Sequence, residues 1–212
     1  MPKKVSENLP RWLEWAREIQ ALAQTGMNYA ADDFNRQRYR RLMTIAAEIT
    51  AEHTSLTQET VEKAFLSARG YATPKISVRG AVFRGGKILL VRDRDDGGWC
   101  LPGGWADVGE PPAAMVEREV LEESGLRVRA VHLVGVYDIN REDGQREILH
   151  AYDLVFLCDD LGGEPGPSNE TSAAGFFGWK EIPPLSKSRT SLRYLEEAFF
   201  HRRNPRLPAV FD

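Results

Sequence analysis

The segment Gly104–Leu126, which reads GWADVGEPPAAMVEREVLEESGL, constrains the fold more than any other part of this 212-residue chain. From Pro111 or Pro112 onward it predicts a helix, because proline is tolerated in the first helical turn, where its missing N–H would have no partner anyway. Gly125 can adopt the left-handed conformation that ends a helix. The segment therefore predicts a loop with glycines that leads into a helix with a defined end.

Three glutamates lie close together on that helix. Glu119, Glu122 and Glu123 are spaced i, i+3 and i+4, so their side chains project from one face. Like charges at this spacing destabilise an isolated helix by about 0.2–0.5 kcal/mol per pair. A hard divalent cation, which prefers oxygen ligands, would compensate them. Arg118 can pair with Glu110 but cannot neutralise all three. A solvated acidic helix face is the alternative, and the surrounding glycine frame makes it the weaker interpretation.

The fixed positions of the segment form a known pattern. Written as GX5EX7REUXEEXGU, with U an aliphatic residue, they match the Nudix box, so the chain resembles the Nudix family. The resemblance implies a hydrolase that holds Mg²⁺ or Mn²⁺ against a diphosphate, with Arg118 and Glu110 as an orienting pair. The metal ligands that it implies are Glu119, Glu122, Glu123 and the backbone carbonyl of Gly104.

The implied reaction is hydrolysis of a nucleoside diphosphate joined to another group X, which gives a nucleoside monophosphate and phospho-X. Cations near the diphosphate neutralise its charge and lower the pKa of the attacking water. The general base is either a box glutamate (Glu119 or Glu122) or a later loop carboxylate, for which Glu170 in PSNETSAAGFF is the candidate. An ordinary turn carboxylate is the alternative interpretation of Glu170.

Three further side chains are candidates for substrate contact. In the alternating run Ile76–Phe83, Arg79 points to the same side as Ser77. It could bind a substrate phosphate as a fork or form a salt bridge at a sheet edge. Trp99 and Trp105 flank the loop before the box helix and could stack on a base. Large aromatic side chains beside a loop more often serve packing, and that alternative stays open.

The composition changes near residues 70–74, which predicts two domains. Residues 1–70 read as a small all-α domain and residues 71–212 as the Nudix domain. The first expected helix is Leu9–Gln24, which Thr25 and Gly26 end, and the third is Thr57–Arg69. The second is capped by Asp32 or Asp33. Its expected buried residues are Phe34, Tyr39, Leu42, Ile45, Ala46 and Ile49. So small a domain has little room for a core of its own. We expect it to pack against the catalytic domain or a second copy, which predicts a homodimer.

The remaining sequence predicts strands joined by turns. Glycines after Arg84 mark a hairpin between the runs SVRGAVF and KILLVRD. Later strands are expected at Val128–Ile139, Ile148–Cys158 and Phe176–Trp179, a polar loop at Asn140–Gln145, and a last helix at Ser188–His201. Together with the box helix, this pattern is similar to the Nudix fold: an α/β class, arranged as an α/β/α sandwich with a mixed sheet.

Several other segments resemble a bacterial Nudix subgroup that carries an N-terminal helical domain. Among them are LPGGWADVGE and ETSAAGFFGWKEIPPLS. That subgroup hydrolyses nucleoside diphosphates joined to small groups, CDP-choline among them, so CDP-choline is the first expected substrate and ADP-ribose the second. A nucleotide-sensing regulator with a Nudix fold is the alternative from another class. Hydrolysis of RNA ends is expected at most as a side activity.

Charge and hydrophobicity indicate which partners the protein has and in which cellular compartment it acts. The formal net charge is −3, and residues 1–70 hold ten Lys and Arg against nine Asp and Glu, so the sequence shows no electrostatic footprint for nucleic acid. No apolar run approaches the roughly 18 residues that span a bilayer, and the N-terminus lacks the apolar core of a secretion signal. We expect a cytoplasmic protein without membrane partners, whose Cys100 and Cys158 are reduced and buried.

Overall fold

The computed structural model describes residues 10–68, 70–141 and 148–212. These residues pack as two compact units. The described residues between 10 and 74, together with residues 148–150, form the helical unit. Residues 75–141 and 151–212 form the sheet unit.

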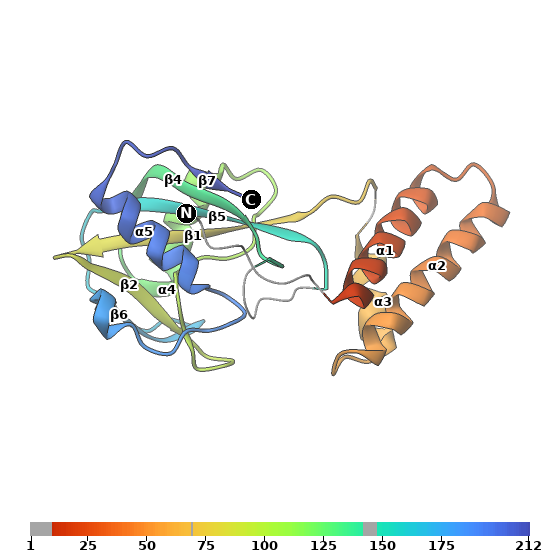
Figure 1. Cartoon of the computed structure of the whole chain (residues 1–212), viewed down its shortest axis with the longest axis horizontal. Helices are drawn as coiled ribbons and strands as arrows, with labels where there is room; N and C mark the ends of the chain where they lie inside the picture. Colours follow the sequence, from red (N-terminus) through yellow and green to blue (C-terminus); the bar gives the residue numbers. More distant parts are fainter. Residues whose placement is uncertain (1–9, 69, 142–147) are drawn as a thin grey trace. The chain divides into compact units, whose positions relative to one another are not determined.

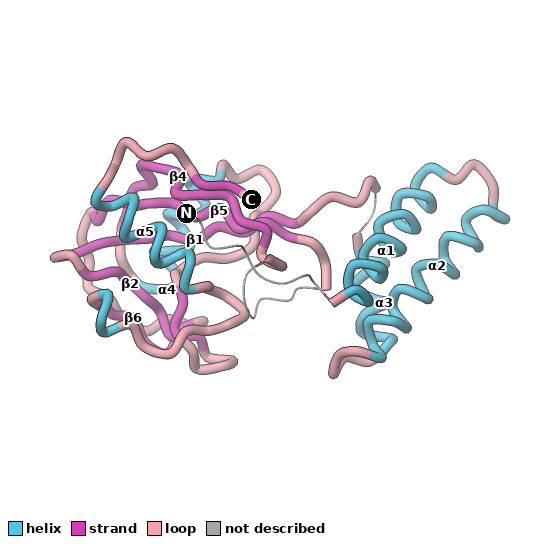
Figure 2. Tube along the Cα trace, viewed as in Figure 1, coloured by secondary structure: helices cyan, strands magenta, loops and turns pink. Residues whose placement is uncertain are grey.

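Three helices form the body of the helical unit: α1 (Arg11–Tyr29), α2 (Asp33–Glu52) and α3 (Gln58–Ser67) (Figure 2). Asp32 and Thr57 cap the second and third helices, because their side chains accept backbone N–H groups of the first turn. The predicted cap at Asp32 is thereby confirmed. The buried core of this unit consists of Ala23, Met43, Ala46, Ala47, Val61 and Phe65.

The first helix runs past the end that the sequence predicts. The predicted stop lies at Thr25 and Gly26, whereas α1 continues to Tyr29. Gly26 lies against the ring of Tyr39 on α2, and a Cβ atom at Gly26 would clash with carbons of that ring. The glycine therefore serves the close approach of two helices rather than a helix stop, so this prediction is wrong. The predicted start at Leu9 lies outside the described residues.

The buried face of α2 also differs from the predicted one. Phe34 and Leu42 are 64% and 37% exposed. Of the predicted stripe, Ala46 is fully buried, and the other buried positions of α2 are Met43, Ala47 and Thr50. The face that meets the neighbouring helices is therefore lined mostly by small side chains, which allow close packing of the helices.

The sheet unit has a mixed sheet, as predicted. Its described strands are β1 (Lys75–Arg84), β2 (Lys87–Asp93), β3 (Trp99–Cys100), β4 (Val128–Asp138), β5 (Ala151–Asp160), β6 (Thr171–Phe177) and β7 (Val210–Phe211). Their order is β3-β2-β1-β5-β4-β7, and β6 pairs with β2. β1 runs parallel to β5 and β4 parallel to β7, while the other pairs are antiparallel.

Helices cover both faces of this sheet (Figure 1). On one face, α4 (Pro112–Ser124) shares a core with Val78 and Val82 of β1. On the other face, α5 (Leu192–Arg203) shares a core with Ala81 of the same strand. The predicted alternation along β1 is confirmed, and so is the α/β/α sandwich.

Two connections in the sheet unit differ in how well the sequence predicts them. Gly85 and Gly86 have φ angles of 58° and 78°, which confirms the tight hairpin between β1 and β2. In contrast, β5 begins at Ala151 rather than Ile148, because Ile148 and Leu149 pack against the core of the helical unit. Residues 142–145 of the predicted polar loop lie outside the described residues.

The last elements are displaced from their predicted positions. The strand expected at Phe176–Trp179 is β6, which begins already at Thr171, because it pairs with β2 along its length. A short 3₁₀ helix, Trp179–Glu181, follows it. The last helix follows Ser191, whose side chain caps its first turn, and does not begin at Ser188.

Both cysteines are free and buried, as predicted. Burial raises the pKa of Cys100 to about 11 and that of Cys158 to about 12, so both thiols stay protonated near neutral pH. Within the described residues, no helix combines the length and the apolar character needed to cross a membrane.

Candidate active site

The loop between β3 and α4 runs along β1 in place of a further strand. The Gly80 N–H donates to the Pro102 carbonyl at 2.8 Å, and the Ala106 N–H donates to the Ile76 carbonyl at 2.8 Å. β1 is therefore hydrogen-bonded on both sides, to this loop and to β5. The pairing fixes the backbone that leads into α4.

Gly103 and Gly104 are required by close packing in this loop. Gly103 has a φ of 154°, and a Cβ atom there would clash with the Val78 carbonyl. A Cβ atom on Gly104 would lie 2.7 Å from the Glu119 carboxylate. The Gly104 carbonyl, which is the predicted backbone ligand, accepts the Val78 N–H at 2.9 Å. The glycines thus let the loop backbone approach both the strand and the Glu119 carboxylate.

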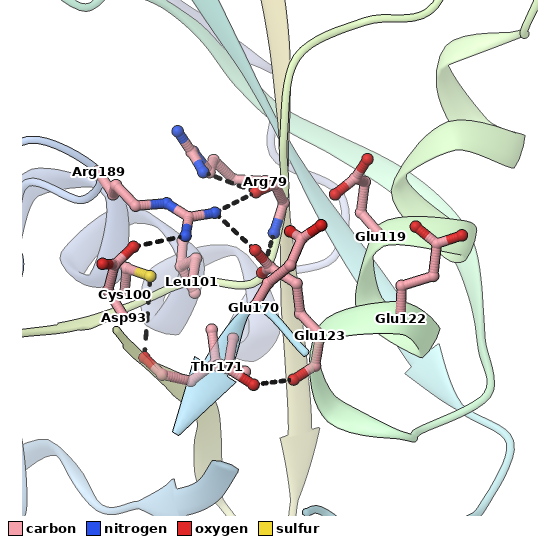
Figure 3. Close-up of polar contacts among 12 residues, drawn as sticks. Arg79, Asp93, Cys100, Leu101, Glu119, Glu122, Glu123, Glu170, Thr171 and Arg189 are labelled. Atoms are coloured by element: carbon pink, nitrogen blue, oxygen red, sulfur yellow. Dashed lines mark hydrogen bonds and ion pairs between the residues drawn. The ribbon is translucent and has the colours of Figure 1, made fainter. Parts of the chain in front are cut away.

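The three box glutamates on α4, drawn in Figure 3, differ in the exposure of their side chains. Glu123 is 1% exposed and Glu119 is 9% exposed, whereas 56% of the Glu122 side chain is accessible. Burial raises the pKa of Glu119, and the nearby negative charges of Glu123 and Glu122 add to this, while Arg118 opposes it. An additional cation beside Glu119 would therefore stabilise its charged form.

Arg118 connects the loop to α4, and the predicted pair with Glu110 is present. Its Nη2 lies 2.9 Å from Oε2 of Glu110. The same guanidinium lies 2.8 Å from Glu122, 3.1 Å from Glu119 and 3.1 Å from Asp107. Hydrogen bonds that Arg118 donates to Glu110, and then those to Glu122, hold the pKa of Arg118 above its usual value. Asp107 is a member of this cluster that sequence reasoning missed.

Glu123 lies in a separate network (Figure 3). The Gly103 N–H donates to its Oε2 at 2.8 Å, and Nη2 of Arg189 donates to its Oε1 at 2.7 Å. The same Nη2 donates to the Gly103 carbonyl at 2.5 Å, and Nη1 of Arg189 donates to Asp93 at 2.8 Å. The Thr171 hydroxyl donates to the Glu123 backbone carbonyl at 2.6 Å. Both oxygens of this buried carboxylate therefore have partners.

Sequence reasoning missed Arg189 because it assigned this residue to the last helix. The helix begins later, and Arg189 lies in the polar run SKSRTS before it. Such a run of small polar residues is typical of a loop, and loops next to a sheet often carry site residues. The polar composition of this run could have identified Arg189 as a loop residue beside the site.

Arg79 forms the salt bridge of the alternative interpretation, but inside the sheet rather than at its edge. It is 8% exposed on β1, which lies between β2 and β5. Its Nε is 3.5 Å from Asp153, and its Nη1 donates to the Gly103 carbonyl at 3.0 Å. The Ser77 hydroxyl donates to the same Asp153 carboxylate. The phosphate fork stays a prediction.

The two tryptophans beside the loop have different surroundings. Trp99 is partly buried and packs edge-on against Phe177, with ring centroids 4.7 Å apart, so its packing interpretation is favoured. Trp105 is 47% exposed, and Nζ of Lys75 lies 5.6 Å from the centroid of its ring. Trp105 therefore keeps an accessible aromatic surface.

A cavity of about 800 Å³ adjoins the box helix. It is lined by Arg94, Glu122, Pro167, Ser168, Asn169 and Glu170. Arg94 donates to the Ser168 carbonyl at 2.8 Å. The sequence did not predict Arg94 as a residue of the site. The Glu170 charge also raises the pKa of Glu119, so the predicted loop acid lies within electrostatic reach of the box.

The carboxylate oxygens of the site are of the type that binds a hard divalent cation, although these carboxylates form ion pairs with arginines. Three glutamates on one helix face, with Glu170 nearby, supply the oxygen ligands that Mg²⁺ and Mn²⁺ prefer. Among the described residues, no three His, Cys, Asp or Glu side chains converge as a ligand group. Arg118 forms ion pairs with Glu119 and Glu122, and Arg189 forms one with Glu123.

Family models match both units. The model described as "NUDIX domain" matches residues 73–198, and the model described as "UDP-X-like, N-terminal oligomerisation domain" matches residues 10–65. The chain therefore belongs to the Nudix family of hydrolases.

Individual relatives agree with this assignment. The chain is 37% identical to the Bacillus subtilis protein YjhB, named provisionally as an ADP-ribose pyrophosphatase, over 95% of this chain and 97% of the relative. A solved UDP-X diphosphatase is similar with a TM-score of 0.61 and 28% identity, over 95% and 98% of the two chains. An ADP-ribose pyrophosphatase from Streptococcus suis has a TM-score of 0.61 and 37% identity, over 66% of this chain and 100% of that one.

Proposed function

We propose that this Nudix hydrolase is a divalent-metal-dependent pyrophosphohydrolase that converts a nucleoside diphosphate joined to X into a nucleoside monophosphate and phospho-X. The observation that carries the proposal is the acidic face of α4 beside the cavity. Glu119 and Glu123 are buried there, and Glu122 lines the cavity. Three carboxylates on one helix face supply the oxygen ligands that a hard divalent cation prefers, so this face suits a bound cation.

Glu119, Glu122, Glu123 and the Gly104 carbonyl would hold Mg²⁺ or Mn²⁺. When bound, the cation neutralises diphosphate charge and lowers the pKa of the attacking water. The position of the Glu119 carboxylate, 2.7 Å from where a Cβ atom on Gly104 would lie, supports this assignment. Arg118 and Glu110 orient the acids by tying the loop to the helix.

Glu170 is the proposed general base. It lines the same cavity as Glu122 and would accept a proton from the attacking water. Its backbone N–H donates to the Ser168 hydroxyl at 3.1 Å, which fixes the turn that carries it. Arg94 adds a positive charge to the lining of this cavity and would bind a phosphate oxygen of the substrate.

The substrate class is a nucleotide with a second phosphorylated group. A cavity of about 800 Å³ is within the size range of small-molecule sites, roughly 300–1,000 Å³. The names of the relatives favour ADP-ribose and UDP-linked compounds, whereas the sequence resemblance led to CDP-choline first. Trp105 offers an exposed ring for stacking on the base.

The test is a panel of ADP-ribose, UDP-sugars, CDP-choline and dinucleotides, hydrolysed in ¹⁸O-labelled water with Mg²⁺ or Mn²⁺. We expect a nucleoside monophosphate as one product and no turnover after chelation. The label shows which phosphorus is attacked. Hydrolysis that continues at the same rate without any divalent cation would refute the proposal.

A further inference from the structure

The guanidinium of Arg189 lies between an oxygen atom of the loop before α4 and an oxygen atom of α4 itself. Its Nη2 lies 2.5 Å from the Gly103 carbonyl oxygen and 2.7 Å from Oε1 of Glu123. The two oxygens come from different elements, the loop and α4. Figure 3 shows Arg189 reaching toward Glu123, with dashed lines that mark these contacts. A single positively charged nitrogen thus bridges a backbone carbonyl and a buried carboxylate.

We infer that Arg189 is an internal cation of the metal-free enzyme, which a divalent cation displaces from Glu123. This rests on the proposed function, in which Glu123 is a metal ligand. Carbonyl and carboxylate oxygens bind Mg²⁺ at about 2.0–2.1 Å. Arg189 Nη2 lies in hydrogen-bond contact with the carboxylate oxygen, and its positive charge opposes a divalent cation at that oxygen.

The electrostatics of Glu123 require such a partner. This side chain is 1% exposed, and a buried carboxylate without a paired charge is strongly unfavourable. The Gly103 N–H and Arg189 provide the compensation. Arg118 does the same for Glu119 and Glu122. Two arginines of the chain therefore neutralise the acidic face of α4.

Arg189 also forms an ion pair with Asp93, which remains when its Nη2 leaves Glu123. Its Nη1 donates to Asp93 at 2.8 Å, and Asp93 also accepts the backbone N–H of Asp95 at 2.7 Å. Burial raises the pKa of Asp93, but the hydrogen bonds from Arg189 and from the backbone outweigh it, so the net shift is downward. Asp93 therefore stays ionised and keeps Arg189 near the site when Nη2 releases Glu123.

The experiment compares metal affinity in the full chain and in two arginine variants. Arg189→Gln removes the internal cation. Arg84→Gln removes an arginine that pairs with Asp160 at 2.6 Å outside the site and serves as the control. After chelation, each protein is titrated with Mn²⁺ alone, by calorimetry and by electron paramagnetic resonance.

We expect Arg189→Gln to bind Mn²⁺ roughly tenfold more tightly than the native chain, because no charge-assisted hydrogen bond has to break. Its metal-free melting temperature falls, and saturating Mn²⁺ restores it further than in Arg84→Gln. Equal or weaker Mn²⁺ binding by folded Arg189→Gln would overturn the inference. Absence of Mn²⁺ binding by the native chain, with nucleotide present, would instead overturn the proposed function.

A measurement on the native chain covers the case in which Arg189→Gln does not fold. The NMR signals of the Arg189 guanidinium report rotation about its Nε–Cζ bond, and Arg189→Lys identifies them. In metal-free protein, contacts at both terminal nitrogens should slow this rotation. Saturating Mg²⁺ should free it. Rotation that stays slow when calorimetry shows bound Mg²⁺ means that Arg189 keeps its contacts, and the inference is then wrong.

Discussion

Glu122 is the box glutamate with the most accessible side chain, and it lines the cavity. We expect Glu122→Gln to lower turnover by roughly a hundredfold or more, the scale of losing one electrostatic stabiliser. The fold should persist, since removing one of several crowded like charges does not cost packing. Steady-state kinetics and thermal melting check both statements. Glu196→Gln, on the exposed side of α5, is the matched control and should keep native turnover.

Another residue-level prediction concerns a histidine pair on the opposite side of the sheet from α4. Nε2 of His132 lies 3.0 Å from Nδ1 of His201, which is buried on α5. Burial lowers the pKa of His201, and the charge of His132 lowers it further. The folded state therefore binds this proton less readily than the unfolded state. Stability is complete above about pH 6.5, the unfolded value, and falls as the pH drops toward the folded pKa.

Urea unfolding at pH 7.5 and 5.5 measures this effect. The native chain should lose more unfolding free energy between the two pH values than His201→Gln, which has no proton to gain there. Titrating groups that do not contact His201 are common to both proteins and cancel in the comparison. An equal loss in both proteins would contradict the assignment to His201.

At the scale of elements, the loop between β3 and α4 depends on a close approach at Gly103. A Cβ atom there would meet the Val78 carbonyl, whereas Gly109 also has a positive φ but open space around it. We expect Gly103→Ala to destabilise the chain by about 1–3 kcal/mol more than Gly109→Ala, the range for local strain. Urea unfolding of both variants separates the free-energy cost of the clash with Val78 from the cost of a positive φ, which both positions share. Equal losses would mean that the loop can move away from β1.

The elements that the sequence predicts well are those with contacts close in the chain. Gly125 ends α4 in the left-handed conformation with a φ of 79°, and Arg118 meets Glu110 at a separation of eight residues. In contrast, Arg189 meets Glu123 across 66 residues, and Thr171 meets it across 48. No local pattern encodes those contacts, because they arise only when the sheet brings distant loops together. The box was therefore predictable and its surrounding network was not.

At the scale of the whole molecule, we propose that the helical unit assembles the enzyme into a homodimer. The name of the matching family model refers to oligomerisation. Large apolar side chains stay exposed on the unit, notably Trp15, Leu22, Tyr29 and Phe34. Exposed large apolar side chains gathered on one unit favour a protein interface there.

Deletion of residues 1–70 tests this proposal and the packing of the unit. We expect monomeric or aggregated protein, because the deletion uncovers Ile148 and Leu149, which pack against the helical core. Light scattering coupled to size exclusion measures the mass. A second truncation that also carries Ile148→Ser and Leu149→Ser should aggregate less and stay monomeric. A dimeric, fully active truncation would show that the dimer forms elsewhere.

The assignment of residues 148–150 to the helical unit means that this unit is built from two separate pieces of chain. Chimeras between relatives must respect this division. A graft that exchanges only the front segment would leave a foreign tripeptide in the transplanted core. A successful exchange has to move residues 148–150 together with the helices.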